Sequence, residues 1–460
     1  MNSPANNGAS KEVVLLVATM ASFLFPFMGS SVNIALPSIG KELSLDAITL
    51  SWIATAYILA SATLLVPFGR IADIYGRKRI FTYGIFIFTV ASLLSGIASS
   101  AAMLISFRVL QGIGSAMITG TGVAMLISVY PADETGKALG INVAATYAGL
   151  SLGPVLGGVL TQHFGWRSIF LINVPLGLVV IAVTLWKLKG DWAEARGEKF
   201  DFAGSIIYCL ALVALVYGFT LLPAMLGVWL IVAGVIGLSA FVRWEMKTRS
   251  PVLDINLFRN SRVFAFSNLA ALINYSATFA VAFLISLYLQ YIKGFHPQGA
   301  GLILVAMPAV QAIFSPLAGR LSDRIEPRVL ASAGMALTTA GLVLFIFLNG
   351  ETPLEFIIVS LLLIGFGFAL FSSPNTNAVM SSAPKRAYGV ASATLATMRQ
   401  VGMVLSMTIA MLMFALYIGR VQITPEHYPF FLESMKTSFI IFAVLCFGGI
   451  FASLARGKIR

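Results

Sequence analysis

Two arginines lie inside long apolar stretches of this sequence, where a charged side chain is costly. Arg108 begins the phrase Arg108-Val-Leu-Gln111-Gly-Ile-Gly, and a spacing of three residues places Arg108 and Gln111 on one face of a helix. Arg399 is followed directly by Gln400 in a second apolar stretch. Ionisable residues inside a membrane segment usually face a ligand pathway, so these four residues are candidates for contacting a substrate. Because both charges are positive, a cavity that contains them would accept neutral or anionic amphiphiles more readily than dications.

Eight further polar residues fall within apolar stretches and are candidates for lining the same cavity. They are Asn33, Asn142, Tyr147, Asn274, Tyr275, Gln311, Asn375 and Asn377. The alternative role for each is a hydrogen bond to a neighbouring helix, worth about 0.6 kcal/mol on average. The alternative for Arg108, near the start of its stretch, is a side chain that reaches back to the membrane surface.

Residues typical of an enzyme active site or a metal site do not gather in this sequence. The three histidines, His163, His296 and His427, fall in predicted loops far apart in the chain. Neither a Ser and His pairing nor a metal-ligand spacing is visible. Cys209 and Cys446 lie in different apolar stretches, so a disulfide is not expected. We therefore expect no enzymatic activity, no cofactor and no metal.

The elements that must position these residues are membrane helices. The chain has 460 residues, of which 58% are hydrophobic and 10% charged, and a mean hydropathy of +0.91. A soluble protein could not bury that much apolar surface. A helix needs roughly 20 apolar residues to cross a bilayer, and the runs lack the alternation of barrel strands. The predicted spans are 13–36, 48–68, 80–98, 102–128, 138–162, 168–186, 203–222, 226–243, 263–290, 299–318, 329–348, 354–380, 388–418 and 437–455.

The basic residues predict the orientation of these fourteen spans. If the N-terminus is cytoplasmic, most Lys and Arg residues outside the spans face the cytoplasm, and the exceptions are Lys41, Arg167, Lys293, Arg420 and Lys436. The first run has no signal-peptide cleavage site and is expected to be retained. We therefore expect a multi-pass protein of the cell membrane with both termini in the cytoplasm. The net charge of +12 is this topology signal and requires no nucleic-acid partner.

A repeated phrase divides the chain into two related halves. Gly69-Arg70-Ile-Ala-Asp73 ends the second span, and Gly319-Arg320-Leu-Ser-Asp323 ends the corresponding span of the second half. This echo predicts an N-terminal tail at 1–12, a six-helix bundle at 13–186, a segment with two extra spans at 187–262, a second six-helix bundle at 263–455 and a tail at 456–460. The charged stretch from Lys187 to Asp201 is expected to be a solvated cytoplasmic linker.

These motifs resemble the major facilitator superfamily, and fourteen spans resemble its drug:proton antiporters of EmrB/QacA type. The first repeat continues as Gly76-Arg77-Lys-Arg79, similar to the family's signature loop. The resemblance implies that Gly69, Arg70, Asp73, Gly76, Arg77 and Arg79, with Gly319, Arg320 and Asp323, form a cytoplasmic latch. It also implies that the arginine of the Arg108 phrase contacts substrate or takes part in proton transfer. The pair Arg399-Gln400 likewise resembles a pair found in this exporter family, and we expect it to contribute charge to the cavity.

Two further stretches carry the resemblance. Gly149-Leu-Ser-Leu-Gly153-Pro154-Val-Leu-Gly157-Gly158 is similar to the antiporter motif of the drug exporters, and glycines four residues apart also make a groove for a neighbouring helix. Gly165-Trp166-Arg167 through Asn173-Val-Pro175-Leu-Gly177 is similar to a stretch that marks the fourteen-span exporters. The resemblance covers nearly the whole chain.

The acidic residues depart from the family pattern. The first span keeps Val32-Asn33-Ile-Ala-Leu-Pro37, but Met28, Gly29, Ser30 and Ser31 precede it where the family usually has an acid. All 18 acidic residues fall in predicted loops or near predicted helix ends. Exchange of cations for protons commonly uses a buried carboxyl group at the membrane midplane. That mechanism therefore lacks its simplest residue here.

The expected function is export of drugs or other amphiphilic small molecules by alternating access, with antiport of protons. The alternatives are a lipid or amphiphile flippase, an uncoupled carrier and, more remotely, a membrane-embedded enzyme. The expected partners are a small amphiphilic substrate and the lipid bilayer, and the expected state is a monomer.

Overall fold

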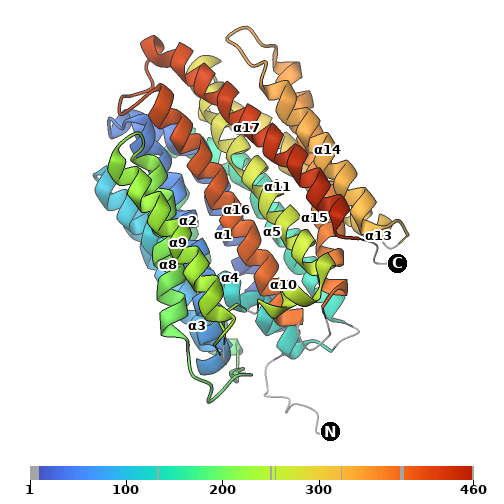
Figure 1. The fold of residues 1–460 in the computed structure, drawn as a ribbon. Coiled ribbons are helices and arrows are strands. Elements are labelled where there is room, and N and C mark those ends of the chain that lie inside the picture. The colour runs from blue at the N-terminus through green and yellow to red at the C-terminus, as the bar shows by residue number, and fades with distance from the viewer. Residues whose placement is uncertain are drawn as a thin grey trace.

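The structure, a computed structural model, describes residues 10–131, 134–248, 251–253, 255–322, 324–383 and 388–457. Its regular elements in these ranges are helices, and they include fourteen spans that are long and apolar enough to cross a membrane. The predicted fold class, an all-helical membrane protein with fourteen spans, is confirmed. Figure 1 shows the long helices running roughly side by side along one direction.

The helices follow the order expected from the sequence. The first six spans are α1 (Lys11–Glu42), α2 (Ala47–Tyr75), α3 (Arg77–Gly96), α4 (Ala101–Val129), α5 (Thr135–Phe164), and α6 (Ser168–Leu171) with α7 (Asn173–Lys187). The inserted spans are α8 (Phe202–Thr220) and α9 (Met225–Glu245), followed by the short α10 (Asn256–Asn260). The last six spans are α11 (Arg262–Leu287) with a π-helical turn (Tyr288–Ile292), α12 (Pro297–Leu304) with α13 (Ala306–Leu321), α14 (Pro327–Phe345), α15 (Leu354–Ser381), α16 (Tyr388–Tyr417), and α17 (Tyr428–Ala455) after a 3₁₀ turn (Pro425–His427).

The two ends of the bundle are distinguished by the turns that lie there. We call the end that contains the turn between α2 and α3 the inner end, and the opposite one the outer end; the inner end lies at the bottom of Figure 1, near α10. At the outer end Asp46 caps the start of α2, because Asp46 Oδ1 accepts hydrogen bonds from the backbone N–H groups of Ile48 and Thr49 at 3.0 and 2.9 Å. The turn that joins α2 to α3 at the inner end uses Gly76, whose φ of 119° is a conformation that favours glycine.

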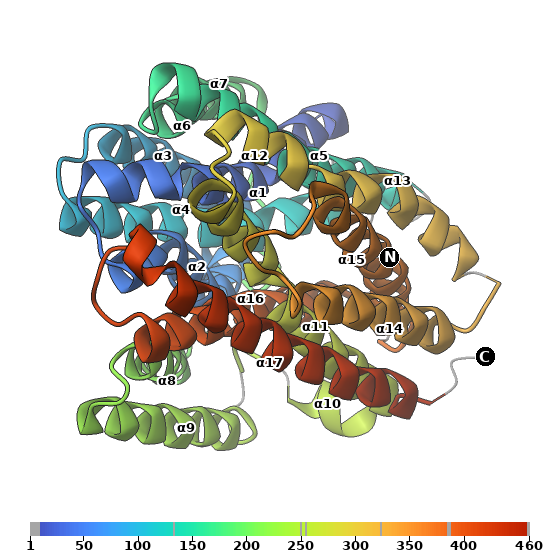
Figure 2. The ribbon, with the colours of Figure 1, turned by 90° about the horizontal axis from the view of Figure 1, so that it is seen from above.

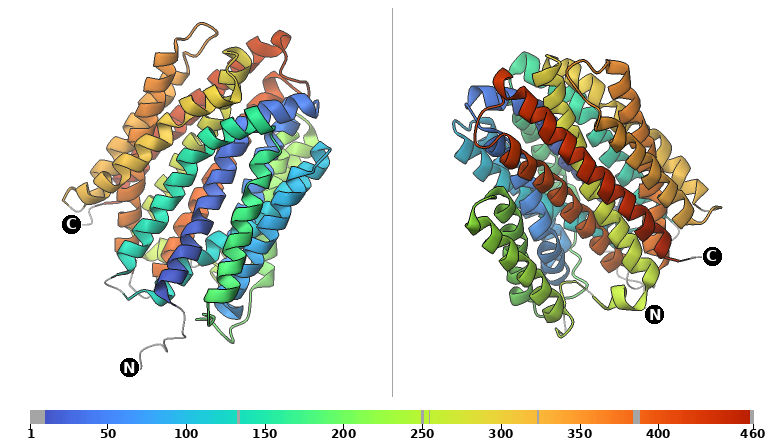
Figure 3. Two further views of the ribbon diagram at one scale, coloured as in Figure 1. Left: turned by 180° about the vertical axis from the view of Figure 1, so that it is seen from behind. Right: turned by 45° about the horizontal axis from the view of Figure 1, so that its top comes forward.

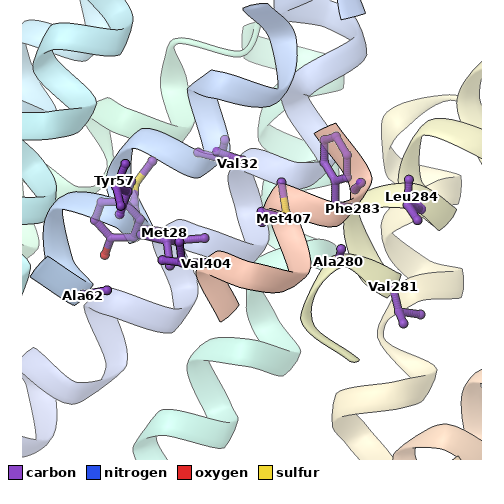
Figure 4. Close-up of a cluster of buried hydrophobic side chains, with 14 of the residues drawn as sticks. Met28, Val32, Tyr57, Ala62, Ala280, Val281, Phe283, Leu284, Val404 and Met407 are labelled. Atoms are coloured by element: carbon purple, nitrogen blue, oxygen red, sulfur yellow. The ribbon is translucent and has the colours of Figure 1, made fainter. Parts of the chain in front are cut away.

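The two bundles, α1–α7 and α11–α17, meet along α1, α2 and α5 on one side and α11, α12, α13 and α16 on the other; Figure 3 shows both bundles from two further directions. Buried apolar side chains join them. Met28, Val32 and Tyr57 from the first bundle lie near Phe283 and Met407 of the second (Figure 4). This packing removes the contact surface of both bundles from the bilayer and from water.

Hydrogen bonds between the two bundles lie toward the outer end. Ser286 Oγ donates to the carbonyl oxygen of Asn33 at 2.7 Å, and Gln290 Nε2 donates to that of Ile34 at 3.0 Å. The backbone N–H of Ala47, at the start of α2, donates to the carbonyl oxygen of Val421 at 3.0 Å. Among the described residues, every hydrogen bond between the bundles joins outer halves of spans or outer loops. We call this contact the outer seam.

The inserted helices α8 and α9 form a hairpin at the edge of the molecule (Figure 2). α8 contacts α2 of the first bundle and α16 of the second, while α9 packs mainly on α8. Tyr208 Oη donates to the carbonyl oxygen of Ala62 at 3.1 Å and Cys209 Sγ to that of Thr63 at 3.2 Å, which fixes α8 to α2. Only 17% of the residues in the most apolar part of α9 are buried, so this helix exposes most of its surface to lipid.

Candidate functional site

Three of the predicted cavity residues come together between the bundles. Arg399 on α16 donates from Nη2 to Thr376 Oγ1 at 2.6 Å, and its guanidinium lies 5.7 Å from the ring centre of Tyr275 on α11. Tyr147, on α5 of the other bundle, is near enough to Tyr275 for their hydroxyl groups to interact electrostatically. No described carboxylate forms an ion pair with Arg399. The result is a positive charge beside the phenol ring of Tyr275, with the phenol of Tyr147 from the other half within electrostatic range of Tyr275.

Several buried polar atoms near this part of the second bundle have no hydrogen-bond partner among the described residues. They are Nε of Arg399, Oε1 of Gln400, and both side-chain amide atoms of Asn274. Asn274 is fully buried and Gln400 is nearly so. A buried donor or acceptor left without a partner costs about 1–3 kcal/mol. These groups are therefore positioned to gain from a ligand or from water that supplies the missing hydrogen bonds.

Arg108 and Gln111 are also held together, but inside the first bundle. Arg108 Nε donates to the carbonyl oxygen of Ile53 at 3.0 Å, and Nη1 donates to Gln111 Oε1 at 2.5 Å. The guanidinium lies 4.1 Å from the ring centre of Tyr57, and the side chain is 1% exposed. Gln111 in turn donates to Ser92 Oγ at 2.7 Å. In this conformation Arg108 is enclosed by protein and does not reach back to the membrane surface.

The other predicted cavity residues are spread over different contacts. Asn142 donates to Ser22 Oγ at 2.8 Å and so joins α5 to α1 within the first bundle. Asn377 donates to Ser322 Oγ at 2.5 Å, and Ser322 belongs to the second repeat phrase. Asn33 is buried at the outer seam, and Gln311 is buried on α13. For Asn142 and Asn377 the hydrogen bonds correspond to the helix-packing alternative considered from the sequence.

Asn375 belongs to a polar cluster around Arg456. The sequence did not reveal this cluster, because Arg456 lies just beyond the last predicted span, 437–455. Arg456, 1% exposed, donates from Nη1 to Asn375 Oδ1 at 3.0 Å and to Ser267 Oγ at 3.2 Å. It also donates from Nε to the carbonyl oxygen of Ser453 at 2.8 Å. Burial lowers the pKa of the Arg456 guanidinium to about 10, so the group stays charged at neutral pH. Arg456 thereby ties α17 to α11 and α15 at the inner end.

Residues 69–79 comprise the end of α2, the turn at Gly76 and the start of α3; we call this segment the latch loop, and a network of charges holds it. Arg77 Nε donates to Asp73 Oδ1 at 2.8 Å, and Arg77 Nη1 donates to Glu194 Oε1 at 2.7 Å. The backbone N–H of Arg77 donates to the carbonyl oxygen of Trp192 at 2.8 Å, and that of Ala195 to the carbonyl oxygen of Asp73 at 2.9 Å. The partners Trp192, Glu194 and Ala195 all come from residues 188–200, which we call the linker.

Two further contacts attach the linker to the latch loop. Asp191 Oδ1 accepts a hydrogen bond from the backbone N–H of Lys78 at 2.9 Å, and its carboxylate occupies the space where a Cβ on Gly76 would lie. Arg70 forms an ion pair with Glu198 at 2.5 Å. The linker is therefore attached to the latch loop through its acidic side chains, which pair with Arg70 and Arg77, while Glu194 and residues 196–199 are exposed, as in a solvated segment.

The remaining latch residues have fewer contacts. Arg79 and Arg320 are exposed. A Cβ on Gly69 would meet no atom within 4 Å, and one on Gly319 would meet only Ser373 at 3.7 Å. Asp323 lies outside the described residues. The role of all these residues as a latch stays a prediction.

The glycine motif of α5 packs on two different helices. A Cβ on Gly149 would come within 2.5 Å of the carbonyl oxygen of Phe23, and Gly153 and Gly157 likewise face α1. Gly158, one position further, faces the second bundle, where a Cβ would lie 2.6 Å from the carbonyl oxygen of Pro297. Pro154 in the same helix abuts Gly301 of α12 through its carbonyl group. The predicted groove is present in this form, with one face inside the first bundle and one at the outer seam.

Comparison with known proteins places this geometry in context. The family model described as "Major Facilitator Superfamily" matches residues 18–407 and 267–458. Riboflavin transporter RibZ of Clostridioides difficile (strain 630) is 32% identical over 445 residues, covering 96% of each chain. Multidrug resistance protein Stp of Mycobacterium tuberculosis (strain CDC 1551 / Oshkosh) is 32% identical over 402 residues, covering 85% of this chain and 74% of Stp.

A solved structure supports the fold. The crystal structure of a bacterial homolog of the human lysosomal transporter Spinster superposes with a TM-score of 0.71 at 17% identity, covering 97% of both chains. Similarity at this level of identity concerns the arrangement of helices alone.

Proposed function

The chain belongs to the major facilitator superfamily, so it is a membrane transporter and not an enzyme, and we propose that it exports neutral or anionic amphiphilic small molecules in exchange for protons. This assigns it to the fourteen-span drug:proton antiporters of EmrB/QacA type. The proposal places the protein in the cell membrane, as a monomer, with the inner end and both termini in the cytoplasm. No nucleic-acid partner is involved.

The observation that carries the proposed substrate class is the environment of Arg399. Its positive charge lies between the bundles without an ion pair to any described carboxylate, and its Nε lacks a partner. A desolvated cation of this kind attracts anions and polar neutral groups and repels cations. The phenol rings of Tyr275 and Tyr147 and the ring of Phe368, 5.2 Å from that of Tyr275, offer apolar surface for a flat ligand.

The relatives support this class of substrate. Riboflavin, which RibZ is named for, has a flat, uncharged ring system with a polar edge, and a site with one cation, amide groups and aromatic rings suits such a molecule. The name of Stp supports export of drugs. Both relatives exceed 30% identity over most of this chain, and on that basis we extend their substrate class to this protein.

Alternating access is supported by the position of the outer seam. With the inner end in the cytoplasm, the hydrogen bonds between the bundles close the extracellular side, as in an inward-facing state. Transport then requires the bundles to separate at this seam and to approach each other at the inner end.

Replacement of Arg399 by glutamine tests the substrate class. In proteoliposomes we expect Arg399→Gln to weaken transport of anionic dyes by about tenfold or more, because a hydrogen bond to a charged group contributes about 1.5–3 kcal/mol and about 1.4 kcal/mol is a factor of ten. Arg420→Gln, which removes an exposed arginine just after α16, is the matched control and is expected to leave transport unchanged. Tight binding and export of lipophilic cations, unaffected by Arg399→Gln, would contradict the proposal.

A second candidate function is uncoupled transport or lipid flipping, and it is favoured because Met28, Gly29, Ser30 and Ser31 occupy the part of the first span where the family usually has an acidic residue. Vesicles with an imposed pH gradient separate the two functions. Proton antiport predicts that uptake into inside-out vesicles is several times faster when their interior is acidic, since protons leaving the vesicle drive substrate entry. Equal rates with and without the gradient would establish the uncoupled carrier instead. Scrambling of fluorescent lipids, measured in the same vesicles, would establish a flippase.

A further inference from the structure

The inserted hairpin contains a buried carboxyl group. Glu245, the last residue of α9, is 3% exposed, and it is the one buried acidic side chain among the residues that the structure describes. Its Oε2 accepts a hydrogen bond from the backbone N–H of Leu253 at 2.8 Å. Its Oε1 is buried and has no hydrogen-bond donor within the described part of the chain. This oxygen therefore lacks the donor that a buried carboxylate requires.

The group that faces this oxygen is a second carboxyl, that of Asp201. Asp201 caps α8, because its Oδ1 accepts from the backbone N–H of Gly204 at 2.9 Å, and its Oδ2 accepts from Trp244 Nε1 at 2.8 Å. A Cβ on Gly204 would lie 2.6 Å from Asp201 Oδ2 and 2.6 Å from Glu245 Oε1. Both oxygens thus converge over Gly204, which brings the two carboxyl groups close enough to interact electrostatically.

Among the described residues, positive charges do not compensate this pair. Arg243 on α9 lies two residues before Glu245, on another face of the helix, and Lys247 lies in the turn after α9; both are exposed. Residues 251–253 carry no charge. On α2, which packs against α8, Arg70 pairs with Glu198 and Asp73 with Arg77. None of the described cations forms an ion pair with Asp201 or Glu245.

Two ionised carboxylates in contact repel each other, and a proton held between them converts the repulsion into a hydrogen bond. A metal ion is a poorer occupant, because it needs more ligands than two carboxyl groups supply, and no group of three potential metal ligands occurs among the described residues. We propose that Asp201 and Glu245 form a proton-binding site at the inner end of the α8–α9 hairpin. The proton is donated by Glu245 to the carboxylate of Asp201. This site is separate from the substrate cavity and does not rest on the proposed substrate.

The position of the pair suggests what the proton controls. Asp201 follows the linker that is attached to the latch loop, and Glu245 holds the backbone of Leu253, shortly before α10 and the second bundle. The pair therefore joins the two segments that connect the hairpin to the two bundles. Loss of the proton places a second negative charge beside the first and pushes the base of α8 from that of α9.

Infrared spectroscopy of the purified full-length protein tests the site. In a detergent without ester groups, a protonated carboxyl has a C=O stretch that is separate from the carboxylate bands and shifts in D₂O. At neutral pH we expect this band in the wild-type protein and its loss in Glu245→Gln. The glutamine has the same shape and can still accept from Leu253. Glu351→Gln, which removes an exposed carboxyl, is the matched control and is expected to keep the band.

A second variant tests the contact with Asp201. Asp201→Ser retains a residue that caps helices well but removes the carboxylate that accepts the proton. We expect the band of Glu245 to move to higher frequency in this variant, because its O–H group loses a charged acceptor. Elution of each variant as a single species in gel filtration shows that it is folded. A spectrum without the band in folded wild-type protein, a band unchanged by Glu245→Gln, or a band unaffected by Asp201→Ser would each overturn the proposal.

Discussion

Replacing Gly158 by alanine is expected to reduce transport about tenfold and to expose the outer seam to solvent. A Cβ at this position would lie 2.6 Å from the carbonyl oxygen of Pro297 and 2.9 Å from the Cα of Gln298, and both are backbone atoms of the opposite bundle. Backbone cannot turn aside as a flexible side chain can, so the bundles must move apart. Overpacking costs about 1–3 kcal/mol, and about 1.4 kcal/mol corresponds to a factor of ten.

The measurement combines transport in proteoliposomes with labelling of a thiol at the seam. Ser286, fully buried and hydrogen-bonded to the backbone of α1, is replaced by cysteine in a background without Cys209 and Cys446. A membrane-impermeant maleimide added outside is expected to react about tenfold faster when Gly158→Ala is present, since the cost given above favours the open seam by that factor.

Gly140 provides the control for this prediction. It lies on the same helix, and a Cβ there would meet no atom within 4 Å. Gly140→Ala has the same effect on helix propensity as Gly158→Ala but leaves the seam intact, so transport and labelling are expected to remain at the wild-type level. If both variants behave alike, the contact between α5 and α12 is not what closes the seam.

The glycine motif shows where sequence reasoning stops. A period of four residues predicts a helix face that accepts close packing, and the structure confirms such a face against α1. Gly158 lies one residue off this period, and its neighbours Pro297 and Gln298 come from the other half of the chain. Which helix lies against each face depends on the tertiary arrangement, which local spacing does not encode.

The fourteen spans were predictable because the lipid requirement is local. Each span must supply about 20 apolar residues by itself, whatever it packs against. The polar residues are different. Tyr147, Tyr275 and Arg399 lie together between the bundles, while Asn142 and Asn375 lie within single bundles. All five residues occur in apolar stretches of the sequence. Whether such a residue faces the other bundle or its own bundle depends on how its helix is rotated about its axis, which the sequence does not show.

The charges of the linker show the same limit. The charged composition of residues 187–201 predicted a solvated segment, but it did not predict what the segment contacts. Pairing of Glu194 with Arg77 and of Glu198 with Arg70 joins residues more than a hundred positions apart, and the sequence contains no signal for it. The sequence places Glu245 near a helix end, and the structure agrees. That this helix end is buried against residues 251–253 could be learned only from the structure.

The attachment of the linker to the latch loop leads to the second prediction of large effect, for Gly76→Ala. Gly76 has a φ of 119°, which a residue with a Cβ adopts only at a cost of about 1–3 kcal/mol. The new methyl group would also take the place of the Asp191 carboxylate, which accepts a hydrogen bond from the backbone of Lys78. We therefore expect the linker to detach. Tryptic cleavage at the exposed Lys189 and Arg196 is expected to accelerate about tenfold or more, because cleavage follows the population of the open form.

Gly69 is the matched control, because it belongs to the same loop and a Cβ there would meet no atom within 4 Å. Gly69→Ala is expected to keep the linker protected from cleavage, whereas Gly76→Ala loses this protection and transport. Two results would be informative in different ways. Rapid cleavage with normal transport would mean that the linker binds the latch loop without taking part in the transport cycle. Equal cleavage rates in both variants would mean that Asp191 does not hold the linker. In that case the methyl group of Gly76→Ala would displace the Asp191 carboxylate without detaching the linker from the latch loop.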